Sequence, residues 1–330
     1  MPTVTAIIPT YNRADALPRA IESVLAQTHD DVEAVVVDDA STDDTQLILE
    51  RYADDDRVRT FTHRENKGGN AARNTALEHA TGDYVALLDS DDEWHPEKVE
   101  RQLDRLDELG DEYVAAYCDW AYELDGTSGS AKQAISGVLS HFQSNAPDEG
   151  GADDLLEPIL ADDLHTAAGS TLLVERDVAE AAGGFDESLD RFQDTDFLIR
   201  VVLEGKLAYA DDVLMTRFDT GSPSADTYAE ANEQLLEKYD DEIAPLVTEG
   251  VDVRGQRALF VAKHYLAEGR FGQGSRHLRN AAVAGPQLPG LAAVVASGLR
   301  QRRRTTGVLV ASTVLLLALL VLGTATGGEE

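Results

Sequence analysis

Apolar and polar positions in the first half of the chain alternate between two periodicities. Four short apolar runs predict buried β-strands, at residues 4–8, 32–37, 58–61 and 84–88. Three segments between them carry apolar residues at helical spacing, at 14–26, 43–52 and 70–79. Strands that alternate with helices predict an α/β fold, with a mostly parallel sheet covered by helices on both faces. Ligands of such sheets bind at the carboxyl ends of the strands, so the residues after each strand carry the functional information.

The second half of the chain has a different pattern. Residues 127–153 are rich in Gly, Ser and acidic residues, which predicts a loop. We expect a strand at 169–174 and a helix at 176–182. Helical spacing recurs in three segments, at 225–239, 257–267 and 274–284. The last two form either a hairpin or one incomplete unit of a helical repeat. The pattern predicts an α/β domain at 1–225 and a helical extension at 226–300.

The end of the chain predicts one transmembrane helix, at residues 305–325. Residues 307–323 include no charged side chain and are mostly Leu, Val and Ala. About 20 such residues can cross a hydrocarbon core of about 30 Å. Four arginines stand directly before the run: Arg300, Arg302, Arg303 and Arg304. This basic flank predicts a single-pass protein of the cell membrane with its catalytic domain in the cytoplasm. A buried soluble helix is the alternative, but no amphipathic stripe interrupts the run.

Composition narrows the class of protein further. The 330 residues include 61 acidic and 28 basic side chains, for a formal net charge of −33. Such a surface repels nucleic-acid phosphates, so we expect no nucleic-acid partner. Acid-rich chains are suited to a cytoplasm at very high salt, which predicts a halophile. The single cysteine, Cys118, excludes an intrachain disulfide, and its apolar surroundings at 113–120 predict a core position.

Polar residues follow the first two predicted strands. Pro9 and Tyr11 end the first strand, and Asp38 and Asp39 end the second. Two carboxylates at a strand end can accept hydrogen bonds from a base N–H group or from ribose hydroxyls. Capping of the next helix explains the residues at 41–44 but not the two aspartates before them.

A second acidic group follows the fourth strand, where Asp89, Asp91 and Asp92 lie within four residues. Crowded carboxylates are costly unless a cation neutralises them, and Mg²⁺ or Mn²⁺ prefers carboxylate ligands. We therefore expect a divalent metal at this turn. Arg73, on the third helix just after a Gly-rich turn, either pairs with a carboxylate or contacts a ligand.

A third acidic pair, Asp194 and Asp196, begins a helix after the glycines at 183–184. The helix dipole favours carboxylates there, so capping is one explanation. Only one of the two is needed as a cap. The other can act as a general base if it points into the site.

Together these motifs resemble the family 2 inverting glycosyltransferases with the GT-A fold, over about residues 3–225. The motifs occur in that family's order: Pro-Thr-Tyr-Asn, Asp-Asp-Ala-Ser-Thr-Asp, Gly-Asn-x-Ala-x-Arg-Asn, Asp-Ser-Asp-Asp, Gly-Gly-Phe-Asp-Glu and an acidic pair. The resemblance implies nucleotide contacts from Pro9, Tyr11, Asp39 and Arg73, with Asp38 nearby. It implies that Asp89 and Asp91 form the DxD motif that meets ribose, metal and diphosphate. It implies that Asp194 is the catalytic base.

Two departures from the family pattern stand out. Gln193 replaces the Glu that commonly precedes the catalytic Asp, and Asp219, in the stretch 217–222, stands where a His is often found. The chain also lacks the Gln-x-x-Arg-Trp motif of processive polysaccharide synthases. Transfer of one sugar is therefore expected rather than polymerisation.

The expected function is inverting, metal-dependent transfer of one sugar from a nucleotide-diphosphate sugar to a membrane-associated acceptor. A polyprenyl- or dolichyl-phosphate-linked glycan of surface or N-glycan (protein glycosylation) assembly, in a haloarchaeal membrane, suits the predicted anchor. One alternative is a catalytically inactive nucleotide-sugar-binding membrane scaffold, which Gln193 favours. Another is a metal-dependent nucleotidyltransferase, but residues 9–13 lack the glycines that a triphosphate-binding loop needs.

Overall fold

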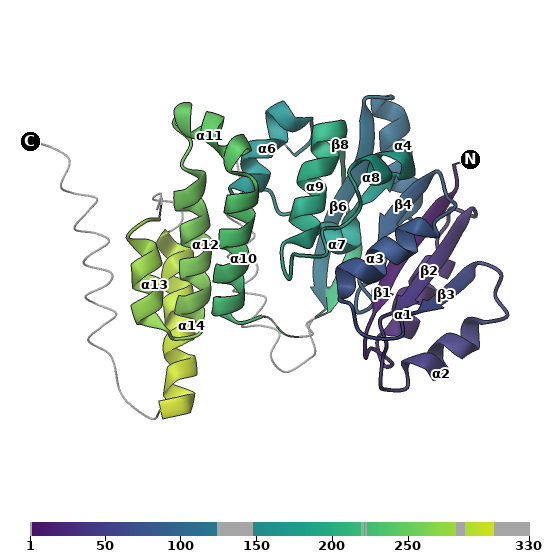
Figure 1. The fold of residues 1–330 in the computed structure, drawn as a ribbon, viewed down its shortest axis with the longest axis horizontal. Coiled ribbons are helices and arrows are strands. Elements are labelled where there is room, and N and C mark those ends of the chain that lie inside the picture. The colour runs from purple at the N-terminus through teal and green to yellow at the C-terminus, as the bar shows by residue number, and fades with distance from the viewer. Residues whose placement is uncertain (1, 124–147, 219–220, 222, 282–287, 307–330) are drawn as a thin grey trace, which may run out of the picture. The chain divides into compact units, whose positions relative to one another are not determined.

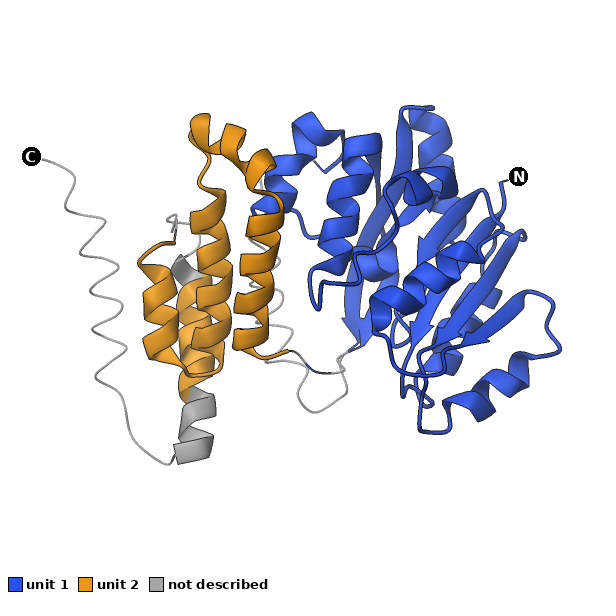
Figure 2. Ribbon diagram, viewed as in Figure 1, with its two compact units in different colours: residues 1–125, 145–221 blue, residues 126–144, 222–330 orange. Residues whose placement is uncertain are grey.

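The computed structural model describes residues 2–123, 148–218, 221, 223–281 and 288–306 (Figure 1). The chain divides into two compact units, Met1–Asp125 with Asn145–Gly221, and Gly126–Ser144 with Ser222–Glu330 (Figure 2). All described strands lie in the first unit, and the described part of the second unit is helical. The domain ranges expected from the sequence remain predictions.

The strands of the first unit form one sheet in the order β3-β2-β1-β4-β7-β6-β8-β5. The strands are β1 (Val4–Thr10), β2 (Val32–Asp38), β3 (Val58–Thr62), β4 (Tyr84–Leu87), β5 (Glu93–Trp94), β6 (Tyr113–Glu123), β7 (Leu173–Glu175) and β8 (Lys206–Phe218). The first four strands are parallel to one another, and β6 is parallel to β8. β7 and β5 run antiparallel to their neighbours. The mostly parallel sheet is confirmed, and the carboxyl ends of β1 to β4 meet at one edge.

Helices cover this sheet because its central strands are apolar on both faces. All seven residues of β1 are buried. Ala6 and Ile8 belong to a core that also includes Leu17 and Ile21 of α1, while α3 packs on β1 and β2. The helices of this unit are α1 (Leu17–Leu25), α2 (Thr45–Leu49), η1 (Glu50–Tyr52), α3 (Gly69–Glu78), α4 (Lys98–Leu109), α6 (Ala152–Leu160), α7 (Ala168–Thr171), α8 (Arg176–Ala181) and α9 (Gln193–Glu204).

Two of the expected elements are wrong in part. The strand expected at 169–174 is the short helix α7 followed by β7. The Trp94 indole donates a hydrogen bond to the Ser170 carbonyl at 2.8 Å, a tertiary contact that local periodicity does not reveal. Residues 152–153, expected in a loop, begin α6, whose apolar side chains are buried at helical spacing. Residues 124–147 of that expected loop lie outside the described part of the chain.

The second unit consists of helices packed around α12. Its helices are α10 (Ala225–Lys238), α11 (Asp240–Thr248), α12 (Val253–Ala267), α13 (Phe271–Leu278) and α14 (Leu288–Thr306). Leu266, Phe271 and Leu291 join α12, α13 and α14 in one apolar core. Arg270 reaches Asp226 of α10 at 2.6 Å, which ties α10 to the turn before α13.

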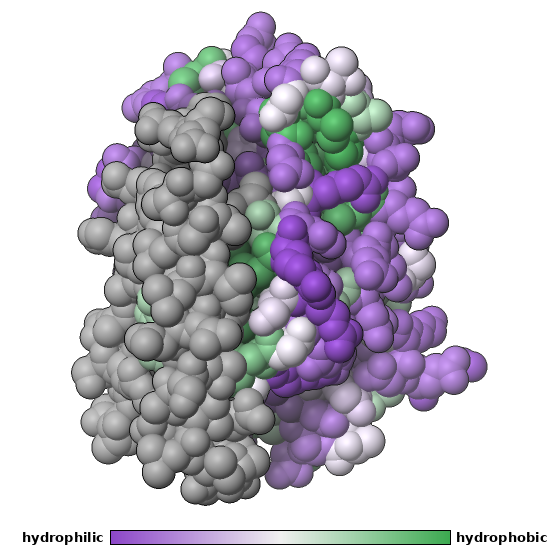
Figure 3. Space-filling model, turned by 90° about the vertical axis from the view of Figure 1, so that its left-hand side faces the viewer, coloured by the Kyte–Doolittle hydropathy of each residue, from purple (hydrophilic) through white to green (hydrophobic). Residues whose placement is uncertain are grey.

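On the face shown in Figure 3, the described residues present a mostly hydrophilic surface with smaller hydrophobic patches.

No helix among the described residues combines the length and the apolar character needed to cross a membrane. α14 ends at Thr306. Residues 307–325 of the predicted span 305–325 lie outside the described part of the chain.

The core beneath the sheet includes a lysine. Lys98 is completely buried, donates to the Gln102 side chain at 2.6 Å and lies 4.2 Å from the centre of the Trp94 ring. Burial lowers the pKa of Lys98 from its ordinary 10.5 to about 8. Cys118 is also buried, as expected, and burial raises its pKa to about 11.

The lowered pKa of Lys98 implies that the stability of the folded chain depends on pH. Between pH 8 and 10.5 the folded chain binds fewer protons at Lys98 than the unfolded chain, so stability rises with pH in this window. We expect the free energy of unfolding of the wild type to rise by about 3 kcal/mol relative to Lys98→Met. Urea unfolding of both proteins at pH 7.5, 9 and 10.5 measures this difference. A constant difference across the window would contradict the prediction.

Candidate active site

The turns after β1 and β2 are joined by side-chain hydrogen bonds. The Asn12 side-chain carbonyl accepts from the Thr42 N–H at 2.7 Å, and the Asn12 N–H donates to the Ser41 hydroxyl at 2.8 Å. Pro9 is buried within β1, and Tyr11 leaves 45% of its surface exposed beyond the strand end. Both predicted nucleotide contacts therefore lie at the carboxyl edge of the sheet.

Asp38 is fully buried, and its oxygens are used within its own turn. It accepts from the Ser41 N–H at 3.1 Å and from the Ser41 hydroxyl at 2.5 Å. Gln46 of α2 also donates to it. These bonds close the turn that leads from β2 into α2, so Asp38 has a clear local role.

Asp39 joins three turns of the same edge. Its carboxylate accepts from the N–H groups of Lys67 at 2.9 Å and Gly68 at 2.7 Å. His63, directly after β3, lies with Nδ1 2.7 Å from Asp39 and with Nε2 2.9 Å from the Thr75 hydroxyl. Sequence reasoning missed His63, although its position after a parallel strand was the available signal. The contacts anchor the Gly-rich segment before α3 to β2.

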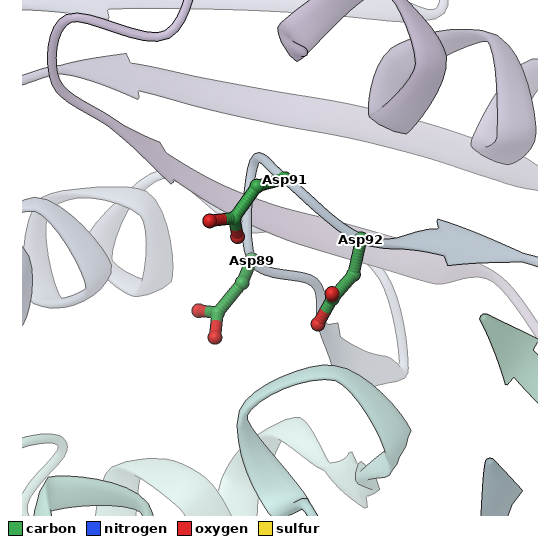
Figure 4. Close-up of side chains that lie close together, drawn as sticks. All are labelled: Asp89, Asp91 and Asp92. Carbon is green, nitrogen blue, oxygen red and sulfur yellow. The ribbon is translucent and has the colours of Figure 1, made fainter. Parts of the chain in front are cut away.

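The turn after β4 gathers three carboxylates. Asp89, Asp91 and Asp92 each offer an oxygen, and these oxygens all lie within 4.8 Å of one another. Figure 4 shows that the three side chains come from one turn and point toward the same space. A cluster of carboxylate oxygens at this spacing suits Mg²⁺ or Mn²⁺. Asp92 was part of the motif read from the sequence but not among the expected ligands.

Helix α7 supports this turn. The Ser170 hydroxyl donates to Asp92 at 2.6 Å and accepts from the Asp89 N–H at 3.1 Å. A side chain at Gly169 would place its Cβ 3.1 Å from an Asp89 oxygen, so the backbone there approaches the carboxylate closely. Nothing in the local sequence pattern indicated this role for Ser170.

Arginines partly neutralise the cluster. The buried Arg73 guanidinium lies 2.5 Å from Asp89, which realises the carboxylate-pairing alternative for this residue. Arg13 lies 3.4 Å from an Asp91 oxygen, and Arg19 donates to the Asp91 carbonyl at 2.7 Å.

Burial and charge repulsion raise the pKa values of two of the carboxylates. Burial raises the pKa of Asp89, Arg73 opposes the shift, and the charges of Asp91 and Asp194 add to it. Burial, together with the charges of Asp89 and Asp91, raises the pKa of Asp92 to about 7. The cluster therefore retains a proton near neutral pH unless a cation favours its ionised form.

The acidic pair at the start of α9 divides into two roles. Asp196 is completely buried and pairs with Arg200 at 2.5 Å, and Arg200 also donates to the Gly184 carbonyl at 2.6 Å. Asp194 is partly exposed, accepts from the Thr195 N–H at 2.9 Å, and acts electrostatically on Asp89. Of the two, Asp194 is the carboxylate that can meet a ligand at the cluster. The side-chain oxygen of Gln193 is buried without a hydrogen-bond partner in the part of the chain that the structure describes.

The structure thus gathers Asp89, Asp91, Arg73 and Asp194 at one edge, with Asp38 and Asp39 on neighbouring turns. Asp219 lies outside the described residues. A cavity of about 410 Å³ opens elsewhere, near Tyr84 at the amino end of β4 and Glu175 at the end of β7, and holds none of the predicted site residues.

Known proteins share both the sequence and the fold. Residues 5–180 match the family described as Glycosyl transferase family 2. An uncharacterized glycosyltransferase of Rickettsia prowazekii is 31% identical over 241 residues, which cover 73% of this chain and 70% of that protein. The succinoglycan biosynthesis protein ExoO of Rhizobium meliloti is 41% identical over 128 residues, 39% of this chain and 36% of that protein.

Solved structures with the same fold include two enzymes bound to nucleotide sugars. S. aureus TarS in complex with UDP-GlcNAc has a TM-score of 0.54 at 19% identity, over 92% of this chain and 74% of that one. The mannosyltransferase PcManGT from Pyrobaculum calidifontis, with GDP-Man and Mn²⁺, has a TM-score of 0.51 at 21% identity, over 100% of this chain and 81% of that one. The structural matches establish an α/β, GT-A-like fold. The family match and the Rickettsia relative show that the chain is a glycosyltransferase and belongs to glycosyl transferase family 2.

Proposed function

We propose that this glycosyltransferase moves one sugar, with inversion, from a nucleotide-diphosphate sugar to a membrane-associated glycan acceptor. The observation that carries the proposal is the cluster of Asp89, Asp91 and Asp92, which Arg73 partly neutralises and which Asp194 influences. The nucleotide-sugar complexes of the two structural neighbours support a donor of this class. The family match decides against the nucleotidyltransferase alternative.

The proposal includes a divalent cation, Mg²⁺ or Mn²⁺, held by Asp89, Asp91 and Asp92. The donor set fits such an ion because it consists of carboxylates, and burial and the neighbouring negative charges raise the pKa of one of them, Asp92, to about 7. When bound, the ion supplies Lewis-acid stabilisation of the negative charge on the donor's diphosphate.

Asp194 acts as the base in this proposal. Its carboxylate accepts the proton of an acceptor hydroxyl, and the hydroxyl oxygen forms a bond to the anomeric carbon of the sugar. The bond from that carbon to the diphosphate breaks on the opposite side, and its electron pair leaves with the nucleotide. Asp196 cannot act as the base because its carboxylate is buried and paired with Arg200.

We expect Asp194→Asn to lower transfer by about 10²–10⁴-fold, because the amide cannot accept the proton. Donor binding should persist, since the acidic turn stays intact. The measurement is a screen of UDP-, GDP- and dTDP-sugars with Mn²⁺ in molar KCl, by transfer to membrane acceptors and by donor titration.

Asp177→Asn is the matched control, because this carboxylate on α8 is 91% exposed and should leave transfer unchanged. Sugar transfer by Asp194→Asn at the wild-type rate would show that Asp194 is not the catalytic base. Donor binding without any transfer by the wild type would instead support the inactive scaffold, which Gln193 favours.

Metal binding should depend on pH through Asp92. Below about pH 7 this carboxyl must release a proton to become a ligand, so Mn²⁺ affinity should fall about tenfold for each pH unit lost. Calorimetric titration of Mn²⁺ between pH 5.5 and 8 measures the slope. In Asp92→Asn the slope should become smaller, because Asp92 no longer releases a proton on metal binding, and an unchanged slope would contradict this assignment.

We also propose attachment to the cell membrane through residues 305–325, with the catalytic domain in the cytoplasm of a haloarchaeon. The uncharged run at 307–323, the arginines before it and the net charge of −33 support this location. A polyprenyl- or dolichyl-phosphate-linked glycan is the proposed acceptor because it would lie at the same membrane surface.

Replacement of residues 305–325 by a Gly-Ser linker of equal length should release the chain from membranes, since no apolar run would remain to enter the bilayer. Fractionation with an alkaline carbonate wash measures the distribution, with the unaltered chain as control. Release of the unaltered chain by the same wash would exclude a transmembrane anchor.

A further inference from the structure

The end of β8 is attached to the acidic turn by groups that the proposed mechanism does not use. The Phe218 N–H donates to an Asp92 oxygen at 3.4 Å. The ring of Phe218 also packs against Arg19, whose guanidinium carbon lies 3.4 Å from the ring centre. These contacts fix the residue before Phe218, Arg217, close to the cluster.

Aromatic side chains of β6 orient Arg217. The register of the parallel pair places Arg217 opposite Tyr122, and Trp120 lies two residues earlier on the same face. The Arg217 guanidinium carbon lies 5.9 Å from the centre of the Trp120 ring. Trp120 and Tyr122 pack edge to face with ring centres 4.9 Å apart, so they form a wall beside the guanidinium.

Arg217 lies within the electrostatic reach of the acidic site. Burial among surrounding atoms lowers the pKa of the guanidinium, but Tyr122 and the charges of the three site carboxylates outweigh this effect and raise the pKa; these carboxylates are Asp92, Asp89 and Asp194. Arg217 nevertheless keeps an exposed side chain, and it forms no ion pair within 4.0 Å in the described part of the chain. It differs in this from Arg73, which contacts Asp89 at 2.5 Å.

A cation held near carboxylates but out of contact with them leaves room for a ligand that both can bind. The ligand would carry negative charge for the arginine and would approach the acidic cluster through a bridging metal ion. A diphosphate has this chemistry. A planar guanidinium matches two phosphate oxygens at once, which an ammonium group cannot do.

We propose that Arg217 binds the diphosphate of the nucleotide donor and stabilises the negative charge that grows on it as the sugar departs. The inference rests on the proposed function, because it requires a nucleotide-diphosphate donor. As the bond to the anomeric carbon breaks, its electron pair stays on the terminal phosphate oxygen, and Arg217 donates hydrogen bonds to that phosphate.

The test compares nucleoside diphosphates with monophosphates. UDP, GDP and dTDP, and the matching monophosphates, are titrated with Mn²⁺ in molar KCl into the wild type, Arg217→Met and Arg217→Lys. Arg217→Met should weaken diphosphate binding about 10- to 100-fold, because charge-assisted hydrogen bonds to the second phosphate are lost. Monophosphate binding should change much less, and Arg217→Lys should fall between the two.

Arg101→Met is the matched control, because Arg101 is an exposed arginine on α4 that pairs only with Glu97 at 3.4 Å among the described residues. Thermal unfolding shows whether each variant is folded. Diphosphate binding by Arg217→Met equal to that of the wild type would overturn the inference, and so would an equal loss for mono- and diphosphates. Failure of the wild type to bind any nucleotide would overturn the proposed function itself, and with it this inference.

Discussion

Mutual repulsion among carboxylates at one edge of the sheet is the constraint on which the rest of this site depends. Two like charges about 4 Å apart repel by about 4 kcal/mol at an effective dielectric constant of about 20. Two contacts offset part of this cost: Arg73 forms an ion pair with Asp89, and the Ser170 hydroxyl donates a hydrogen bond to Asp92. Burial, together with the remaining repulsion from Asp89 and Asp91, raises the pKa of Asp92. A turn built in this way favours the binding of a proton or a cation, which is why the proposed function includes a divalent metal ion.

The turns around the site are held in conformations that their residues rarely adopt. Asn12, Ala40, Ala167 and Phe192 have positive φ, and they lie in the turns after β1 and β2 and directly before α7 and α9. For residues other than glycine this backbone costs about 1–2 kcal/mol each. Bonds such as that between Asn12 and Thr42 hold the turns in place. The site is therefore shaped by the surrounding fold before any ligand arrives.

Three arginine and lysine side chains are buried in the described part of this acidic chain. Arg73 is buried against the acidic cluster, Lys98 is buried beneath the sheet, and Arg257 is completely buried in the helical unit. Most of the acidic residues lie at the surface, where a high salt concentration, as in the proposed haloarchaeal cytoplasm, would screen their repulsion. Arg217 differs from these buried residues because it is exposed and lies near the acidic cluster.

The sequence by itself determined the parallel strands β1 to β4 and the polar residues that follow them, because burial on both faces leaves apolar runs that can be read locally. It also placed Asp194 beside Asp196 at a helix start, without separating them. Only the tertiary structure decided that Asp196 is buried against Arg200 while Asp194 remains accessible near Asp89. The same holds for Ser170 and Phe218, which form hydrogen bonds with the acidic turn from 81 and 126 residues away. Periodicity records which face of an element is buried, but partners so distant in the chain meet only when the sheet is assembled.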